Sequence, residues 1–176
     1  MSDPQPLRLH IGGTEARAGW KILNIQPGPA VDYVGTCVSL AQFADGSVAE
    51  VYASHVLEHL GFREEIPRAL AEIYRVLVPD GRLSVSVPDF DVLCRLFTHP
   101  ELPADQKFSI MMHVFGAQED AHDLHKIGFT QDFLAAFLAQ AGFQRFRRVE
   151  NFDLFNDFSK AQRFGVPISL NVEAYK

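Results

Sequence analysis

The first third of the chain carries short apolar runs that alternate with polar residues, which is the period of β-strands. Each run ends at a glycine or proline turn, and the pattern predicts strands at residues 7–11, 21–25 and 31–34. The intervals between them are short, because a helical crossover between parallel strands needs a dozen or more residues. We therefore expect a shortened first crossover, with residues 12–20 forming a loop or one helical turn.

Residues 48–60, VAEVYASHVLEHL, change from a strand pattern to a helical one. The apolar run follows an Ala-Asp-Gly-Ser turn and ends at Ser54 and His55, after which the apolar residues have helical spacing. Ligands bind beyond the carboxyl ends of strands in open α/β sheets, so Ser54 and His55 are candidate site residues. The alternative is that Ser54 only caps the helix that follows.

The middle of the chain predicts a β-α-β unit. Apolar residues recur at helical spacing across residues 62–77, and the turn VPDG at 78–81 ends that helix. A strand at 83–87 follows, and Asp89 is placed to cap a helix that runs to Phe97. Such a unit is right-handed with parallel strands, so both strands are expected to end at the same edge of the sheet.

The C-terminal half predicts the remaining elements of an α/β sheet. They are a helix at 102–115, a polar loop at 116–127, a helix at 131–141, a strand at 145–149 and a strand at 168–175. Thr130 is a good N-cap for the second of these helices, and Gly142 is suited to end it. No internal repeat or linker divides the chain, so we expect a single domain over residues 1–176.

Charge and cysteine content narrow the class of protein. The 16 Lys and Arg against 22 Asp and Glu give a net charge of −6, which argues against a nucleic-acid partner. Cys37 and Cys94 are far apart and in no Cys-x-x-Cys spacing, so a disulfide framework or thiolate metal site is not expected. No apolar run reaches the ~18 residues of a membrane span and no export signal is recognised, so a cytoplasmic location is expected.

The order of these motifs resembles the class I S-adenosylmethionine-dependent methyltransferases. The resemblance rests on LRLHIGG, KILNIQPGP, ASHVLEHL and LVPDGRLSVSVPD, and the closest likeness is to a small bacterial group of predicted methyltransferases. It implies a Rossmann-like α/β fold: a seven-stranded, mostly parallel sheet with one antiparallel strand and helices on both faces. It also implies methyl transfer to a small-molecule or cell-surface sugar acceptor, and a homo-oligomer is possible.

The resemblance places the cofactor S-adenosylmethionine along Gly12, Gly13, Thr14, Gln26, Thr36, Cys37 and Ser54. In the family the glycine turn usually reads Gly-x-Gly, and the second and third strands end in acidic residues. Here Thr14, Gln26 and Thr36 replace them. Neutral groups in place of two carboxylates could weaken cofactor affinity by roughly ten- to a hundredfold. The alternative function is therefore a catalytically silent relative that serves as a binding or assembly module.

Histidines are the candidate groups for removing a proton from the methyl acceptor. His55 at the strand end and His125 in the polar loop are predicted as catalytic residues, whereas the position of His59 beside apolar helical residues favours a structural role. His113, His122, Asp123 and His125 also suggest a metal, but this spacing within a loop is weak, and none is expected. The loop is instead expected to cover the active-site edge.

Overall fold

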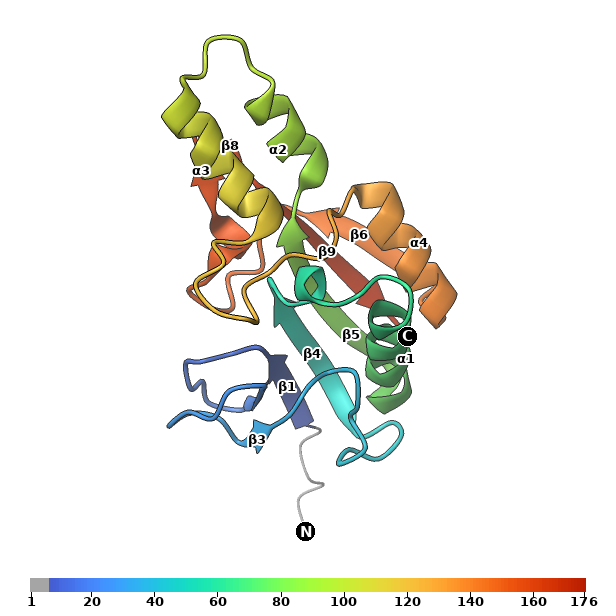
Figure 1. Ribbon diagram of the computed structural model, residues 1–176. Helices are drawn as coiled ribbons and strands as arrows, with labels where there is room; N and C mark the ends of the chain where they lie inside the picture. The colour runs from blue at the N-terminus through green and yellow to red at the C-terminus, as the bar shows by residue number, and fades with distance from the viewer. Residues whose placement is uncertain (1–6) are drawn as a thin grey trace.

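A computed structural model describes residues 7–176 as one seven-stranded sheet flanked by helices (Figure 1). The strand order is β3-β2-β1-β4-β5-β9-β6; β9 is antiparallel to both of its neighbours, and the other pairs are parallel. The strands are β1 (Leu7–Ile11), β2 (Lys21–Asn24), β3 (Tyr33–Val34), β4 (Val48–Ser54), β5 (Leu77–Pro88), β6 (Arg145–Val149) and β9 (Ser169–Tyr175). The expected Rossmann-like sheet with one antiparallel strand is confirmed.

Four α-helices and two single 3₁₀ turns complete the main body. They are η1 (Leu57–His59), α1 (Glu65–Val76), α2 (Phe90–Phe97), α3 (Ala104–Phe115), α4 (Gln131–Ala141) and η2 (Phe158–Lys160). As predicted, Asp89 accepts a hydrogen bond from the backbone N–H of Val92 at the start of α2. Thr130 does the same for Phe133 at the start of α4, and Gly142 ends that helix with φ 109°.

Several element boundaries differ from the prediction. The helix expected directly after β4 is only the single turn η1, because α1 begins at Glu65. The strand β5 is assigned from Leu77, but its register with β4 jumps from Leu77 to Arg82, so the Pro-Asp-Gly turn is looped out of the ladder. A hairpin of β7 (Gln162–Arg163) and β8 (Val166–Pro167) lies between the two last predicted strands, in the Phe-rich residues 151–167 that we call the aromatic loop.

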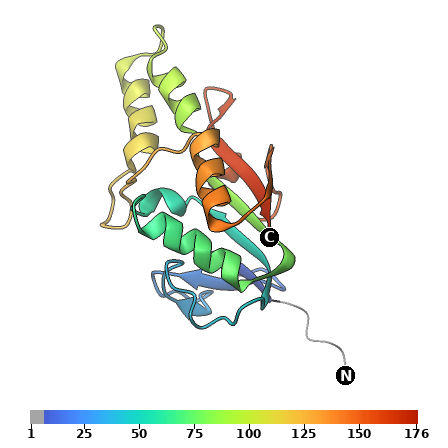
Figure 2. The same cartoon turned by 90° about the vertical axis from the view of Figure 1, so that its right-hand side faces the viewer.

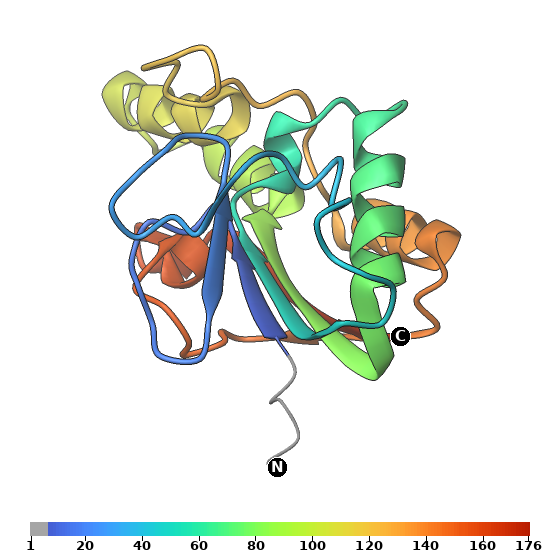
Figure 3. The same ribbon diagram turned by 90° about the horizontal axis from the view of Figure 1, so that it is seen from below.

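One face of the sheet is apolar and carries α1 and α4, which pack side by side (Figures 2 and 3). Alternate strand residues such as Leu9, Val51 and Val85 point into this core and are fully buried there. The helices α2 and α3 lie beyond the carboxyl end of the sheet (Figure 1). The hydrophobic core is therefore concentrated between one sheet face and two helices.

The two faces of the sheet carry different amounts of helix. Among the described residues, the second face carries only the single turn η2, which packs on β9 and β5, together with irregular chain. Tyr52 and His10 point to this face and pack against Phe155 from the aromatic loop, with His10–Phe155 ring centroids 4.0 Å apart. The helices are absent because the connections between β1, β2, β3 and β4 are short or irregular.

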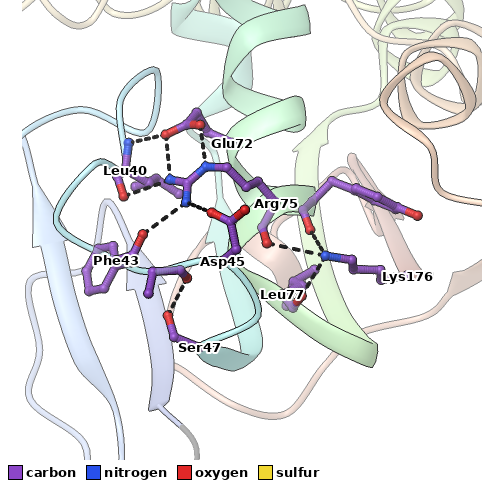
Figure 4. Close-up of polar contacts among 10 residues, drawn as sticks. Leu40, Phe43, Asp45, Ser47, Glu72, Arg75, Leu77 and Lys176 are labelled. Carbon is purple, nitrogen blue, oxygen red and sulfur yellow. Dashed lines mark hydrogen bonds and ion pairs between the residues drawn. The ribbon is translucent and has the colours of Figure 1, made fainter.

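The segment between β3 and β4 is held by side chains of α1 (Figure 4). Arg75 donates from Nη2 to the Leu40 carbonyl and from Nη1 to the Phe43 carbonyl, each at 3.0 Å. Glu72 accepts from the backbone N–H of Leu40 at 2.8 Å. Hydrogen bonds from Arg75 lower the pKa of Glu72 to about 2, so the network is charged. It fixes the chain that follows Thr36, where the candidate site begins.

Candidate functional site

A cavity of about 490 Å³ opens beyond the carboxyl ends of β1, β2 and β3. Its lining includes residues from the turn after each strand, as the topology predicts for an α/β sheet. Five of the predicted site residues lie here: Gly12, Gln26, Thr36, Cys37 and His55. We call this space the first cavity.

The glycine turn after β1 brings backbone close to the first cavity. Gly12 has φ 78° and donates its N–H to the Leu23 carbonyl at 2.8 Å, and a Cβ there would lie 2.6 Å from the Val56 side chain. Gly13 has a different reason to be glycine, since its Cβ would lie 2.4 Å from Nδ1 of His10. Gly13 and Thr14 do not line the first cavity. The turn thus presents Gly12 to a ligand and packs Gly13 against the sheet.

The end of β2 supplies Asn24 as well as Gln26. Asn24 is the last residue of the strand, lines the first cavity and donates from its side chain to the Gly13 carbonyl at 3.0 Å. Its Oδ1 accepts from the backbone N–H of Gln26 at 2.9 Å, which orders the turn. The sequence interpretation missed Asn24 because it placed the strand end at Ile25. A polar residue at the end of an apolar run was the available signal.

Thr36 and Cys37 form the wall of the first cavity that follows β3. The Thr36 side chain is exposed, and its hydroxyl accepts from the backbone N–H of Val38 at 3.3 Å. Cys37 is 3% exposed, and burial raises its pKa to about 11, so it is an uncharged thiol. Opposite them, Lys126 pairs with Glu65 at 3.1 Å at the edge of the cavity. This pair was not predicted from the sequence.

A second cavity of about 400 Å³ adjoins the first one. Gly12, His55 and His59 line both cavities, so they form the boundary between them. Ser54 and His125, two further predicted residues, line the second cavity, together with Glu58 from η1 and His113 from α3. The loop expected to cover the active-site edge contributes Leu124 to the first cavity and Asp123 to the second.

Ser54 does not cap the turn that follows it. The N-cap residue of η1 is Val56, which makes no side-chain cap hydrogen bond. The Ser54 hydroxyl is buried, and among the described residues it has no hydrogen-bond partner. The structure therefore rules out the capping alternative and leaves a buried hydroxyl at the wall of the second cavity.

His55 is held in a strained backbone conformation with both ring nitrogens near polar groups. Its φ is 53°, a region that non-glycine residues seldom adopt and that often marks functional sites. Its Nδ1 lies 3.2 Å from Oε1 of Glu58, and its Nε2 lies 3.0 Å from the Ser169 hydroxyl. Burial acts to raise the pKa of Glu58, but the contact with His55 and the nearby imidazoles hold it below the usual value. The strand end therefore carries a carboxylate–imidazole pair.

The rings of His59 and His125 pack edge to face, with centroids 4.8 Å apart. Nδ1 of His59 lies 3.3 Å from the Leu124 carbonyl, and Nδ1 of His125 lies 3.1 Å from the His113 carbonyl. Burial lowers the pKa of His125, which favours the neutral imidazole. The sequence interpretation treated His59 as structural; its place at the boundary of both cavities was not expected.

Comparison with known proteins shows which domain this chain is similar to. Residues 15–85 match the family model of a methyltransferase domain. No curated protein sequence matches the chain significantly. A helix long and apolar enough to cross a membrane is not found among the residues that the structure describes.

Solved structures of methyltransferases share the fold at low sequence identity. An S-adenosylmethionine-dependent methyltransferase from Archaeoglobus fulgidus has a TM-score of 0.62 at 14% identity, covering 97% of this chain and 86% of its own. One from Thermotoga maritima, described as a possible histamine N-methyltransferase, has 0.56 at 19%, covering 99% and 84%. The 1,6-didemethyltoxoflavin-N1-methyltransferase of Burkholderia thailandensis, with bound S-adenosylhomocysteine, has 0.56 at 16%, covering 98% and 72%.

The chain thus shares its fold with solved S-adenosylmethionine-dependent methyltransferases, and residues 15–85 match the model of a methyltransferase domain. The fold that the sequence resemblance implied is confirmed, and the domain match agrees with that resemblance.

Proposed function

We propose that this protein binds S-adenosylmethionine in the first cavity and transfers its methyl group to a small molecule held in the second. The observation that carries this proposal is the shared boundary of Gly12, His55 and His59 between the two cavities. Methyl transfer is an in-line displacement, so donor and acceptor must meet across one boundary. The second cavity, at about 400 Å³, is within the usual size range for small-molecule sites.

The proposed donor site combines backbone and neutral polar groups. Gly12 brings the main chain close to the ligand, and Asn24 offers an amide. Gln26 and Thr36 offer an amide and a hydroxyl where the family resemblance implies carboxylates. Neutral hydrogen bonds contribute less than charge-assisted ones. We therefore expect weaker cofactor binding than a site with carboxylates in these places would give.

His55 is the residue that we propose to face the transferred methyl group and to accept a proton from the acceptor where it has one. It lines both cavities, and the carboxylate of Glu58 beside Nδ1 orients the ring. The Ser169 hydroxyl donates its single hydrogen to the Phe158 carbonyl at 2.7 Å, so it does not donate to Nε2 of His55. His125, the other predicted catalytic residue, lines the acceptor side.

The proposal keeps several expectations that rest on the sequence alone. They are one domain over residues 1–176, a cytoplasmic location in a bacterium, no nucleic-acid partner, a possible homo-oligomer, and an acceptor that is a small molecule or a cell-surface sugar intermediate. The polar lining of the second cavity, including Asp123 and Arg163, favours an acceptor that carries polar groups.

Calorimetry with S-adenosylhomocysteine tests the donor site. Thr36→Trp places a large side chain in the first cavity from an exposed position, so we expect at least a tenfold loss of affinity without loss of folding. Ser39→Trp is the matched control, since Ser39 is exposed on the same segment but does not line the cavity.

Two outcomes would contradict the proposal. If neither S-adenosylmethionine nor S-adenosylhomocysteine raises the unfolding temperature at millimolar concentration, the folded state does not bind them. That result would favour the alternative of a silent binding or assembly module. Equal affinity in Thr36→Trp and in the unchanged protein would place the ligand elsewhere.

A further inference from the structure

The boundary of the second cavity carries a cluster of three side chains that can each bind a metal ion: Glu58, His59 and His125. One ligand atom from each residue can be chosen so that all three lie within 4.8 Å of one another. Glu58 and His59 come from η1, and His125 comes from the polar loop more than sixty residues later. Methyl transfer as proposed above gives His59 no role and uses Glu58 only to orient His55. The cluster therefore needs its own explanation.

Glu58 is the least satisfied member of the cluster. Its side chain is fully buried, and within the described part of the chain neither carboxylate oxygen has a hydrogen-bond partner. Nδ1 of His55 lies 3.2 Å from Oε1 of Glu58 without an aligned hydrogen bond. Burying a carboxylate in this way is costly unless it is paired, hydrogen-bonded or coordinated to a metal. It lines the second cavity, where a cation could reach it.

The two histidines are fixed in the manner of metal ligands. In each ring Nδ1 lies 3.1 to 3.3 Å from a backbone carbonyl, and a carbonyl only accepts, so Nδ1 carries the hydrogen. Each Nε2 is then left with its lone pair. A histidine that binds a metal usually donates its other ring N–H to a carbonyl or carboxylate, which fixes its tautomer.

We propose that Glu58, His59 and His125 bind a divalent first-row transition-metal ion such as Zn²⁺. Two imidazoles and one carboxylate suit zinc, iron, cobalt or nickel, whereas Mg²⁺ and Ca²⁺ prefer oxygen ligands. Ligand atoms around a tetrahedral zinc are roughly 3.3 Å apart, so the cluster must contract by about 1.5 Å, which side-chain rotation can supply.

The site would leave a coordination position open to the second cavity. Three protein ligands and one exchangeable position are typical of catalytic rather than structural zinc sites. A metal there would hold an oxygen or nitrogen of the molecule in that cavity. This gives His125 a ligand role in place of the proton-accepting role predicted from the sequence, and the inference does not depend on methyl transfer.

Metal titration of the chelator-treated full chain tests the proposal. With Zn²⁺ and a competing indicator we expect one ion per chain, and with Co²⁺ we expect visible absorption bands of a low-coordinate site. Glu58→Gln, His59→Ala and His125→Ala should each lower Zn²⁺ affinity at least tenfold, because losing even a group that only hydrogen-bonds to a metal ligand costs roughly 10–100-fold. His122→Ala is the matched control, since it is an exposed histidine of the same loop outside the cluster.

The readouts separate this site from the proposed donor site. Absence of stoichiometric Zn²⁺ binding would overturn the proposal, and so would binding that His59→Ala and His125→Ala leave unchanged. Loss of binding in His122→Ala alone would place the ion on the loop instead. The double variant His59→Asn/His125→Asn keeps polar groups at both positions, and its unfolding temperature shows whether lost binding reflects lost folding. S-adenosylhomocysteine affinity, measured separately with and without Zn²⁺, reports on the donor site alone.

Discussion

His10 lies beneath the glycine turn of the first cavity as a buried, uncharged imidazole. It is 6% exposed, packs against Phe155 and Tyr52, and occupies the space that a side chain at Gly13 would need. Burial lowers its pKa to about 4, although the charge of Asp157 acts to raise it. The conformation of the glycine turn therefore depends on the imidazole of His10, which is buried and uncharged.

Acid should destabilise the protein through His10. Its pKa is 6.5 when exposed and about 4 when folded, so the unfolded state binds more protons below pH 6.5. The contribution of neutral His10 is complete above pH 6.5 and decreases as the pH falls toward 4, by up to about 3 kcal/mol at 1.36 kcal/mol per unit. Urea unfolding of His10→Phe at pH 7 and pH 4 should show a correspondingly smaller loss than the unchanged protein. His99→Phe, at an exposed histidine, should not.

Site residues were predicted correctly where they follow a strand end or a glycine turn. They were missed where their place in the site depends on contact with a distant segment of the chain. Gly12, Thr36 and His55 follow predicted strands and do line a cavity. His59 was interpreted as structural, because its contact with the Leu124 carbonyl depends on a loop that has no periodic pattern. Sequence spacing shows which side chains share an element, but not which element folds over them.

Arg75 stabilises an element that has no regular structure of its own. Its guanidinium binds the carbonyls of Leu40 and Phe43 and contacts the carboxylates of Asp45 at 2.6 Å and Glu72 at 2.7 Å (Figure 4). Arg75 itself lies in the last turn of α1. The backbone N–H of Gly46 donates in return to the Arg75 carbonyl at 3.0 Å. Side chains of a helix thus provide the bonds that a helix between β3 and β4 would otherwise make internally.

Removing this guanidinium should loosen the wall of the first cavity. We expect Arg75→Met to lower the free energy of unfolding by about 2 kcal/mol, since it removes hydrogen bonds made by a charged group that is itself partly exposed. Hydrogen exchange at Leu40 and Gly46 should accelerate, and affinity for S-adenosylhomocysteine should fall. Arg68→Met, at an exposed position of the same helix, is the control. Unchanged exchange at Leu40 would contradict the role given to Arg75.

Elements with both a periodic pattern and a stop signal were predicted nearly residue for residue. For α4, the cap at Thr130 and the left-handed Gly142 define both ends locally. The hairpin of β7 and β8 was missed because its two-residue strands are too short to show a period. The extent of β3 was overestimated for a related reason: only Tyr33 and Val34 find a partner on β2.

The sheet has one apolar face and one polar face. This asymmetry follows from the short connections between β1, β2, β3 and β4. Sequence spacing predicted the shortened first crossover, and the second face carries irregular chain and the turn η2 where α-helices would otherwise pack. In their place, a row of alternating charges crosses the sheet near the amino ends of the parallel strands: Arg8, Glu50, Arg82, Glu173 and Arg147. Ion pairs thus satisfy the polar groups at this end of the face, whereas Phe155 covers Tyr52 and His10 nearer the carboxyl ends.

Glu173 is the central acceptor of this charged row and should be its most sensitive member. Its carboxylate is 10% exposed and accepts from Arg147 at 2.8 Å, Arg82 at 3.2 Å and the Tyr175 hydroxyl at 2.9 Å. Glu173→Gln removes the charge and turns a donor toward these donors, so we expect a loss of about 2 kcal/mol in urea unfolding at pH 7. Glu101→Gln, at an exposed site, should change little. If Glu173→Gln and Glu101→Gln have the same free energy of unfolding, the charged row contributes no net stability. The polar face would then be stabilised by its contacts with the aromatic loop instead.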